Sequence, residues 1–87
     1  MKRKECLDTA DAAVNGQRDE QYGSPEDNFL EIARLWSIYL GRPVSPPDVA
    51  ALMILLKVAR AKSTPHAEDS WVDIAGYAAC GVEVATL

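Results

Sequence analysis

The chain has 87 residues, of which 48% are hydrophobic and 25% are charged. This length and composition predict one folded domain, residues 1–87, with a modest core, and they exclude a disordered chain. Thirteen acidic residues against nine basic residues give a net charge of −4. Because domains that bind a nucleic-acid backbone are usually basic, we expect no nucleic acid as a partner.

The N-terminal part of the chain predicts a short helix and a polar connector. A helix from about Arg3 to Val14 places five apolar residues on one narrow stripe, and Asn15-Gly16 ends it because both residues tolerate a left-handed conformation. The stripe consists of Cys6, Leu7, Ala10, Ala13 and Val14. In the connector Gln17–Gly23, Tyr22 either packs as an anchor or is presented to a ligand.

The second predicted helix begins at Ser24–Asp27, which supplies a capping serine, a proline and two acids for the first turn. It runs to about Leu40 and stops at Gly41. Its predicted core face consists of Phe29, Ile32, Ala33, Trp36 and Leu40. The opposite side carries Asp27, Glu31, Leu35 and Ile38, with Asn28 at its edge. Because that side mixes carboxylates with large apolar residues, we expect a second buried contact there, with the first helix or with another subunit.

The longest apolar run lies in the third predicted helix, Asp48–Lys62, which begins at the capping sequence Ser45–Asp48 and ends near Ser63. No polar side chain occurs from Val49 to Leu56, and a helix that is apolar all round is a buried one. It is too short to cross a bilayer, which takes about 20 apolar residues. We therefore expect the third helix to be the buried centre of a small bundle.

The last predicted helix begins within Pro65–Asp69 and continues towards the C-terminus. Its predicted core face consists of Trp71, Val72, Ala75, Ala78, Ala79 and Val82. A neighbouring strip carries Asp69, Asp73, Gly76 and Cys80. No segment shows the alternation of a strand, so the sequence predicts an all-α fold of four helices with short connections.

The cysteines and the start of the chain bear on the cellular compartment. Cys6 and Cys80 are the only cysteines and lie far apart in the sequence, so we expect free thiols in a reducing cytoplasm. The basic first residues are followed by acids and not by an apolar run, so we expect no signal peptide. We expect no membrane partner.

Stacked acidic residues are the best candidates for chemistry. Asp69 and Asp73 lie one turn apart on the last helix, and Glu31 lies about one turn from Asp27 or Asn28 on the second helix. Two helices that present oxygen ligands to each other can hold Mg²⁺ or Mn²⁺, and Mg²⁺ often bridges carboxylates to substrate phosphates. The alternative is structural: acids near a helix N-terminus stabilise its dipole, and Asp73 forms a buried salt bridge.

Two cations, Lys57 and Arg60, share one face of the third helix. Either they stabilise the C-terminal end of the helix dipole, or they face an anion or a carboxylate cluster. In the second case they would meet the phosphate charge that a metal leaves unneutralised. In the structural alternative they are the expected salt-bridge partners of Asp73.

Four short motifs together resemble a family of small phage and prophage proteins of unknown function. They are N-G-x-R at Asn15–Arg18, Y-G-S-P-E-D-N-F at Tyr22–Phe29, L-K-V-A-R at Leu56–Arg60 and D-S-W-V-D-I-A-G-Y at Asp69–Tyr77. That family in turn looks distantly like the MazG-like all-α nucleoside triphosphate pyrophosphohydrolases. Those oligomeric enzymes are similar to dimeric dUTPases and hold Mg²⁺ with an E-x-x-E and an E-x-x-D motif. They cleave nucleoside triphosphates to the monophosphate and pyrophosphate.

The resemblance implies a site of eight residues in a protein of the host-cell cytoplasm. The implied Mg²⁺ (or Mn²⁺) ligands are Asn28, Glu31, Asp69 and Asp73, of which Glu31 and Asp73 would be catalytic. The implied nucleotide-binding residues are Arg18, Lys57 and Arg60 for the phosphates and Tyr22 for stacking on the base. Two positions depart from the motifs: Asn28 stands where a glutamate is expected, and Asp69 and Asp73 are four residues apart instead of three.

A second hypothesis is a non-catalytic oligomeric module for helix interaction or nucleotide binding. In it, the same acids and cations form ion pairs that fix the helix register. Free oxygens of Glu31 and Asp73 converging in a cleft would favour the enzyme, whereas full pairing with Lys57, Arg60 or Arg34 would favour the module. Under either hypothesis, the apolar central helix and the two-sided second helix predict a homo-dimer or homo-tetramer.

Overall fold

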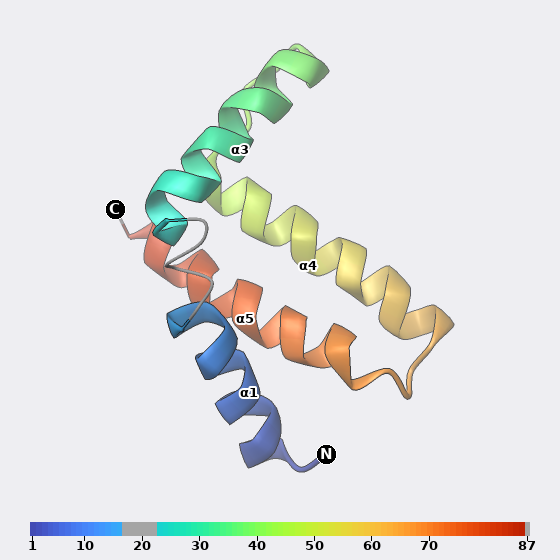
Figure 1. Cartoon of the computed structure of the whole chain (residues 1–87). Coiled ribbons are helices and arrows are strands. Elements are labelled where there is room, and N and C mark those ends of the chain that lie inside the picture. Colours follow the sequence, from blue (N-terminus) through green and yellow to red (C-terminus); the bar gives the residue numbers. More distant parts are fainter. Residues whose placement is uncertain (17–22, 87) are drawn as a thin grey trace.

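The computed structural model describes residues 1–16 and 23–86, and this part of the chain is all-α. It contains four helices, shown in Figure 1, with no strand among the described residues. They are α1 (Arg3–Asn15), α3 (Pro25–Leu40), α4 (Pro46–Ser63) and α5 (Glu68–Ala85). The predicted helices are therefore confirmed, with ends that differ by at most three residues, whereas Arg18 and Tyr22 lie outside the described residues.

The helices form an open arrangement built on α5. The chain reverses at residues 64–67, so that α4 and α5 lie side by side and antiparallel (Figure 1). The helix α1 packs chiefly on α5, whereas α3 packs on both α4 and α5 near the C-terminal end of α5. None of the described helices has the length and apolar content that a membrane span requires.

Local sequence signals explain where α3 and α4 begin and end. The Ser24 hydroxyl accepts a hydrogen bond from the Asp27 N–H at the start of α3. Gly41 ends α3 at a φ of +68°, a left-handed conformation that glycine adopts without steric cost. At the start of α4, Ser45 and Asp48 cap each other's backbone N–H groups, in a reciprocal capping box.

The core lies where α3, α4 and α5 meet. Its buried members are Phe29, Ala33, Val49, Ala50, Cys80 and Val84. Gly76 lets α1 approach α5 closely, because a Cβ at this position would lie 3.1 Å from Cγ1 of Val14. The buried side of α5 consists of Ser70, Val72, Gly76, Cys80 and Val84.

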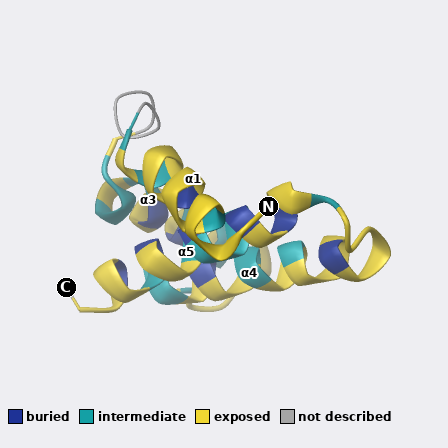
Figure 2. Ribbon diagram, turned by 90° about the horizontal axis from the view of Figure 1, so that it is seen from below, coloured by how far each residue is buried: buried dark blue, intermediate teal, exposed yellow. Residues whose placement is uncertain are grey.

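The prediction that the third helix is buried all round is wrong for the single chain. More than half of α4 is exposed (Figure 2), including the large residues Leu52, Leu55, Leu56 and Val58. The reason is the open arrangement: α4 packs against α3 and α5, while α1 packs chiefly on α5.

Several predicted core positions are also exposed. On α5, Trp71 and Val82 are 52% and 64% exposed, because the small residues of the neighbouring strip face the adjacent helices instead. The Trp71 indole N–H donates to the Pro65 carbonyl at 3.1 Å, so this ring packs over the turn before α5. On α3, Leu40 is exposed, and the apolar residues Leu35 and Ile38 of the opposite side have no buried contact within the described chain.

Candidate functional site

A groove between α4 and α5 brings together four of the predicted site residues, Lys57, Arg60, Asp69 and Asp73. Its cavity volume is about 550 Å³, within the range of small-molecule sites. The remaining lining residues are Ala59, Ser63, Thr64, Ala67 and Ser70. The groove lies at the closed end of the α4–α5 hairpin, so it combines the last turns of α4 with the first turns of α5.

An ion pair crosses the groove from α4 to α5. The Lys57 Nζ lies 2.9 Å from the Asp73 Oδ2, and these side chains are 16% and 38% exposed. The predicted salt bridge of Asp73 is therefore present, with Lys57 as its partner, and this pairing is what the non-catalytic module predicts for Asp73. This pair fixes the Asp73 carboxylate in the wall of the groove and engages the Lys57 charge.

Arg60 and Asp69 are the two remaining charged groups of the groove. Both side chains are exposed, and neither forms an ion pair or a side-chain hydrogen bond with any described residue. Arg60 is therefore the cation available to an anion in the groove. Asp69 is a carboxylate available to a cation, one helical turn from Asp73.

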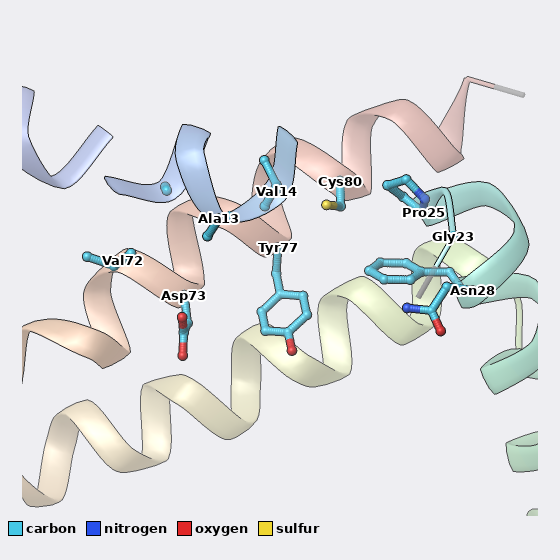
Figure 3. Close-up of a pocket in the computed structure, with 12 residues that line it drawn as sticks. Ala13, Val14, Gly23, Pro25, Asn28, Val72, Asp73, Tyr77 and Cys80 are labelled. Atoms are coloured by element: carbon cyan, nitrogen blue, oxygen red, sulfur yellow. The ribbon is translucent and has the colours of Figure 1, made fainter. Parts of the chain in front are cut away.

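Asp73 also lines a second, narrow pocket, whose other residues come chiefly from α1, α3 and α5. Figure 3 shows Asp73 and Tyr77 projecting from α5, with Asn28 reaching the same pocket from α3. The rings of Phe29 and Tyr77 lie 6.4 Å apart between centroids. The cavity volume is about 30 Å³, space for one or two water molecules and not for a nucleotide base.

The four predicted metal ligands are not assembled in the single chain. Glu31 is exposed on α3 and lines neither the groove nor the pocket, and Asn28 meets Asp73 only in the narrow pocket. Within residues 1–16 and 23–86, no three His, Cys, Asp or Glu side chains lie close enough to share a metal ion. Asp69 and Asp73 remain as a pair of carboxylates. Such a pair fits Mg²⁺, which proteins commonly bind through one or two carboxylates together with substrate phosphates.

Ser70 is the residue of the groove that the sequence analysis missed. It is 7% exposed, and its hydroxyl has no hydrogen-bond partner among the described residues. Ser70 also lies in the first turn of α5, whose N-cap residue Ala67 offers no side-chain hydrogen bond. The sequence signal was available: Ala67 stands where α3 and α4 have a capping serine.

Two groups with shifted pKa values lie outside the groove. A hydrogen bond with the Glu83 carboxyl, helped by its own backbone N–H and by Ser24, holds the pKa of Glu26 below its ordinary value. At the N-terminus, a hydrogen bond to Glu68 raises the pKa of the Met1 amino group. The Glu68 carboxylate is thus turned towards Met1, beside the first turn of α5.

The chain is similar to two phage proteins. It is 49% identical over 74 residues to the "Gene 55 protein" of Mycobacterium phage D29, covering 85% of this chain and 49% of that protein. The "Gene 55 protein" of Mycobacterium phage L5 is 48% identical over 73 residues, covering 83% and 47%. The chain thus spans about half the length of these curated relatives, and no solved structure matches it. Residues 5–85 match the domain of unknown function DUF6378, and the chain therefore belongs to that family.

Proposed function

We propose that the chain is a Mg²⁺-dependent nucleoside triphosphate pyrophosphohydrolase of the MazG-like type, with the α4–α5 groove as its phosphate site. The observation that carries this proposal is the charge arrangement of the groove. Two carboxylates one turn apart, Asp69 and Asp73, face the available cation Arg60 across a cavity of about 550 Å³. A metal-bound triphosphate needs both kinds of charge in one place.

Each groove residue has a definite role in this proposal. Asp69 and Asp73 would hold Mg²⁺, or Mn²⁺, which binds readily to one or two carboxylates when substrate phosphates are present. Lys57 positions Asp73 through the 2.9 Å ion pair, and Arg60 binds a phosphate oxygen. A bound Mg²⁺ would supply Lewis-acid polarisation of the phosphate and help to activate the attacking water. Water attacks the α-phosphorus, the bond to the bridging oxygen breaks, and pyrophosphate leaves with the monophosphate as the second product, while the proton of the attacking water passes to solvent.

The other four predicted residues take part only as further proposals. Asn28 would assist Asp73 from the narrow pocket that both line, whereas Glu31 lies outside the groove and we assign it no contact there. Arg18 on the phosphates and Tyr22 on the base belong to the connector, outside the described residues.

Self-association is part of the same proposal, as a homo-dimer or homo-tetramer. Large apolar side chains are exposed on α3 and α4, and exposed apolar patches are typical of protein–protein contacts. They are Leu35, Ile38, Tyr39, Leu40, Leu52, Leu55, Leu56 and Val58. This surface also favours a second candidate function, a non-catalytic oligomeric helical module in which the Lys57–Asp73 pair is purely structural.

The decisive experiment is turnover with product identification. The chain is incubated with Mg²⁺ and a panel of ribo- and deoxyribonucleoside triphosphates, and the products are separated. The enzyme predicts monophosphate and pyrophosphate, with a loss of at least about a hundredfold in Asp73→Asn, and the same direction in the exposed Asp69→Asn. Asp8→Asn on α1 is the matched control, because Asp8 is exposed and, among the described residues, pairs with Lys4 alone.

The two candidate functions give opposite outcomes. A folded wild-type chain that hydrolyses no triphosphate in Mg²⁺ would favour the module. In that case, sedimentation should still show that wild type forms an oligomer. Leu55→Glu should dissociate this oligomer, because Leu55 is 61% exposed on α4.

A further inference from the structure

The first turn of α5 opens into the groove without a cap. The first N–H groups of any helix lack a carbonyl acceptor within the helix and carry the positive end of its dipole. In α3 and α4 a serine at the N-cap occupies one of these donors, whereas Ala67 at the N-cap of α5 cannot. Ala67, Asp69 and Ser70 all line the groove.

Ser70 independently indicates a ligand at this point. Its hydroxyl has no partner among the described residues, although the residue is 7% exposed. Every fully buried side-chain polar atom of the described chain has a hydrogen-bond partner. The Ser70 Oγ has none, so it is not fully buried, and it reaches solvent where Ser70 lines the groove. Because this hydroxyl has no protein partner and reaches the groove, its hydrogen bond is available to a ligand there, in exchange for water.

The charges around Ser70 define the ligand. Arg60 faces this end of the groove without a partner in the described chain, whereas Lys57 is engaged by Asp73. Among the described residues, Asp69 is the one groove carboxylate without an ion pair. Its charge repels a bare anion and attracts a cation that is bound to that anion. An oxyanion that carries a divalent cation matches this set.

We infer that the first turn of α5, with Ser70 and Arg60, is an oxyanion subsite for the pyrophosphate end of the substrate. This assignment rests on the proposed function for the identity of the anion. The Ser70 hydroxyl and the first N–H groups of α5 donate to phosphate oxygens from one side, and Arg60 donates from the other. Asp69 makes binding dependent on Mg²⁺.

Calorimetric titration with inorganic pyrophosphate, with and without Mg²⁺, tests the subsite. Wild type binds pyrophosphate more tightly with Mg²⁺, and Ser70→Ala and Arg60→Gln each lose about tenfold in affinity. Ser63→Ala is the matched control in the same groove, because its hydroxyl already donates to the Ala59 carbonyl. Arg34→Gln on α3 controls for the loss of one positive charge outside the groove.

Asp69→Asn separates the binding of the bare anion from the gain in affinity that Mg²⁺ provides. Removing this carboxylate strengthens binding of metal-free pyrophosphate about threefold or more and removes most of the gain from Mg²⁺. An Asp69→Asn variant that weakens metal-free binding would contradict the predicted repulsion. Wild type that binds no pyrophosphate, or Ser70→Ala and Arg60→Gln variants that bind it like wild type, would overturn the subsite.

Failure of the subsite and failure of the enzyme give different results. If triphosphates are hydrolysed while pyrophosphate affinity is insensitive to Ser70 and Arg60, the subsite is wrong and the enzyme stands. If pyrophosphate binds as predicted while no triphosphate is hydrolysed, the subsite stands as a binding site and the pyrophosphohydrolase is wrong.

Discussion

The starts of α4 and α5 show two ways to begin a helix. At α4, Ser45 and Asp48 close the first turn with two reciprocal hydrogen bonds of 3.3 and 3.0 Å. At α5, Ala67 leaves the first turn open beside Ser70 and Arg60. The start that the chain closes with its own side chains serves the fold, whereas the start that it leaves open in a groove is available to a ligand.

The two helix starts also differ in what they contribute to the free energy of unfolding. A missing N-cap costs a helix about 1 kcal/mol, and α5 bears that cost in a chain of 87 residues whose total stability is small. Binding sites commonly sacrifice stability in this way. The following substitutions test whether the open start of α5 is such a site.

Closing the open start should have the largest effect. Ala67→Asp places an acceptor where α4 has one, so its side chain takes the N–H of Asp69 or Ser70 and adds a negative charge beside the anion subsite. We expect pyrophosphate affinity to fall by about 2 kcal/mol, roughly thirtyfold, while the free energy of unfolding rises by about 1 kcal/mol. Calorimetry and urea unfolding measure the two effects. If Ala67→Asp binds pyrophosphate with wild-type affinity, the open start of α5 is not the anion subsite.

Breaking the ion pair in the groove should have the next largest effect. Lys57→Met keeps the apolar stem and leaves the half-buried Asp73 carboxylate without its partner. Because Asp73 is 38% exposed, we expect a loss of only about 1–2 kcal/mol in the free energy of unfolding. Triphosphate turnover should fall with little change in pyrophosphate affinity, since Lys57 positions Asp73 and does not line the oxyanion subsite. A parallel loss of both would instead make Lys57 a direct phosphate ligand.

Opening the closed start is the reciprocal experiment. Ser45→Ala removes one half of the capping box of α4, and we expect the free energy of unfolding to fall by about 1 kcal/mol. Pyrophosphate binding should not change, because Ser45 lies at the opposite end of α4 from the groove. A new anion site in Ser45→Ala would show that any uncapped helix start of this chain binds pyrophosphate, against the specific role of Ser70 and Arg60.

The smallest effect is expected in the stability of Ser70→Ala. The wild-type hydroxyl makes no hydrogen bond within the described chain, so its removal should leave the free energy of unfolding within about 0.5 kcal/mol of wild type, or raise it slightly. Chemical unfolding measures this value on the sample used for pyrophosphate titration. A loss well above 1 kcal/mol would mean that Ser70 has a structural role.

The helices could be predicted from the sequence because their ends are encoded locally. Ser24-Pro25 and Ser45-Pro46 begin α3 and α4, and Gly41 ends α3 in a left-handed conformation. The buried faces could not be predicted as well, since they depend on which helices become neighbours. On α5, the small residue Gly76 faces α1, and Trp71 is exposed. On α4, the apolar run does not indicate how many neighbouring helices cover it.

The candidate site was predictable in part for the same reason. Spacing along one helix placed Asp69 with Asp73 and Lys57 with Arg60, and the antiparallel packing of α4 and α5 then brought the two pairs into one groove. Glu31 lies on α3, and no local signal fixes its distance from the groove. Ser70 was missed because a serine in a first helical turn is ordinary, and its meaning comes from the missing cap at Ala67.

The most direct test is calorimetric titration of Mg²⁺ into the chain in the presence of a non-hydrolysable nucleoside triphosphate, with wild type and Asp73→Asn compared. We expect that wild type binds the metal and the nucleotide together, each strengthening the other, and that folded Asp73→Asn loses this coupling. Wild type that binds neither ligand, or Asp73→Asn with undiminished coupling, would contradict a metal-assisted phosphate site in the α4–α5 groove.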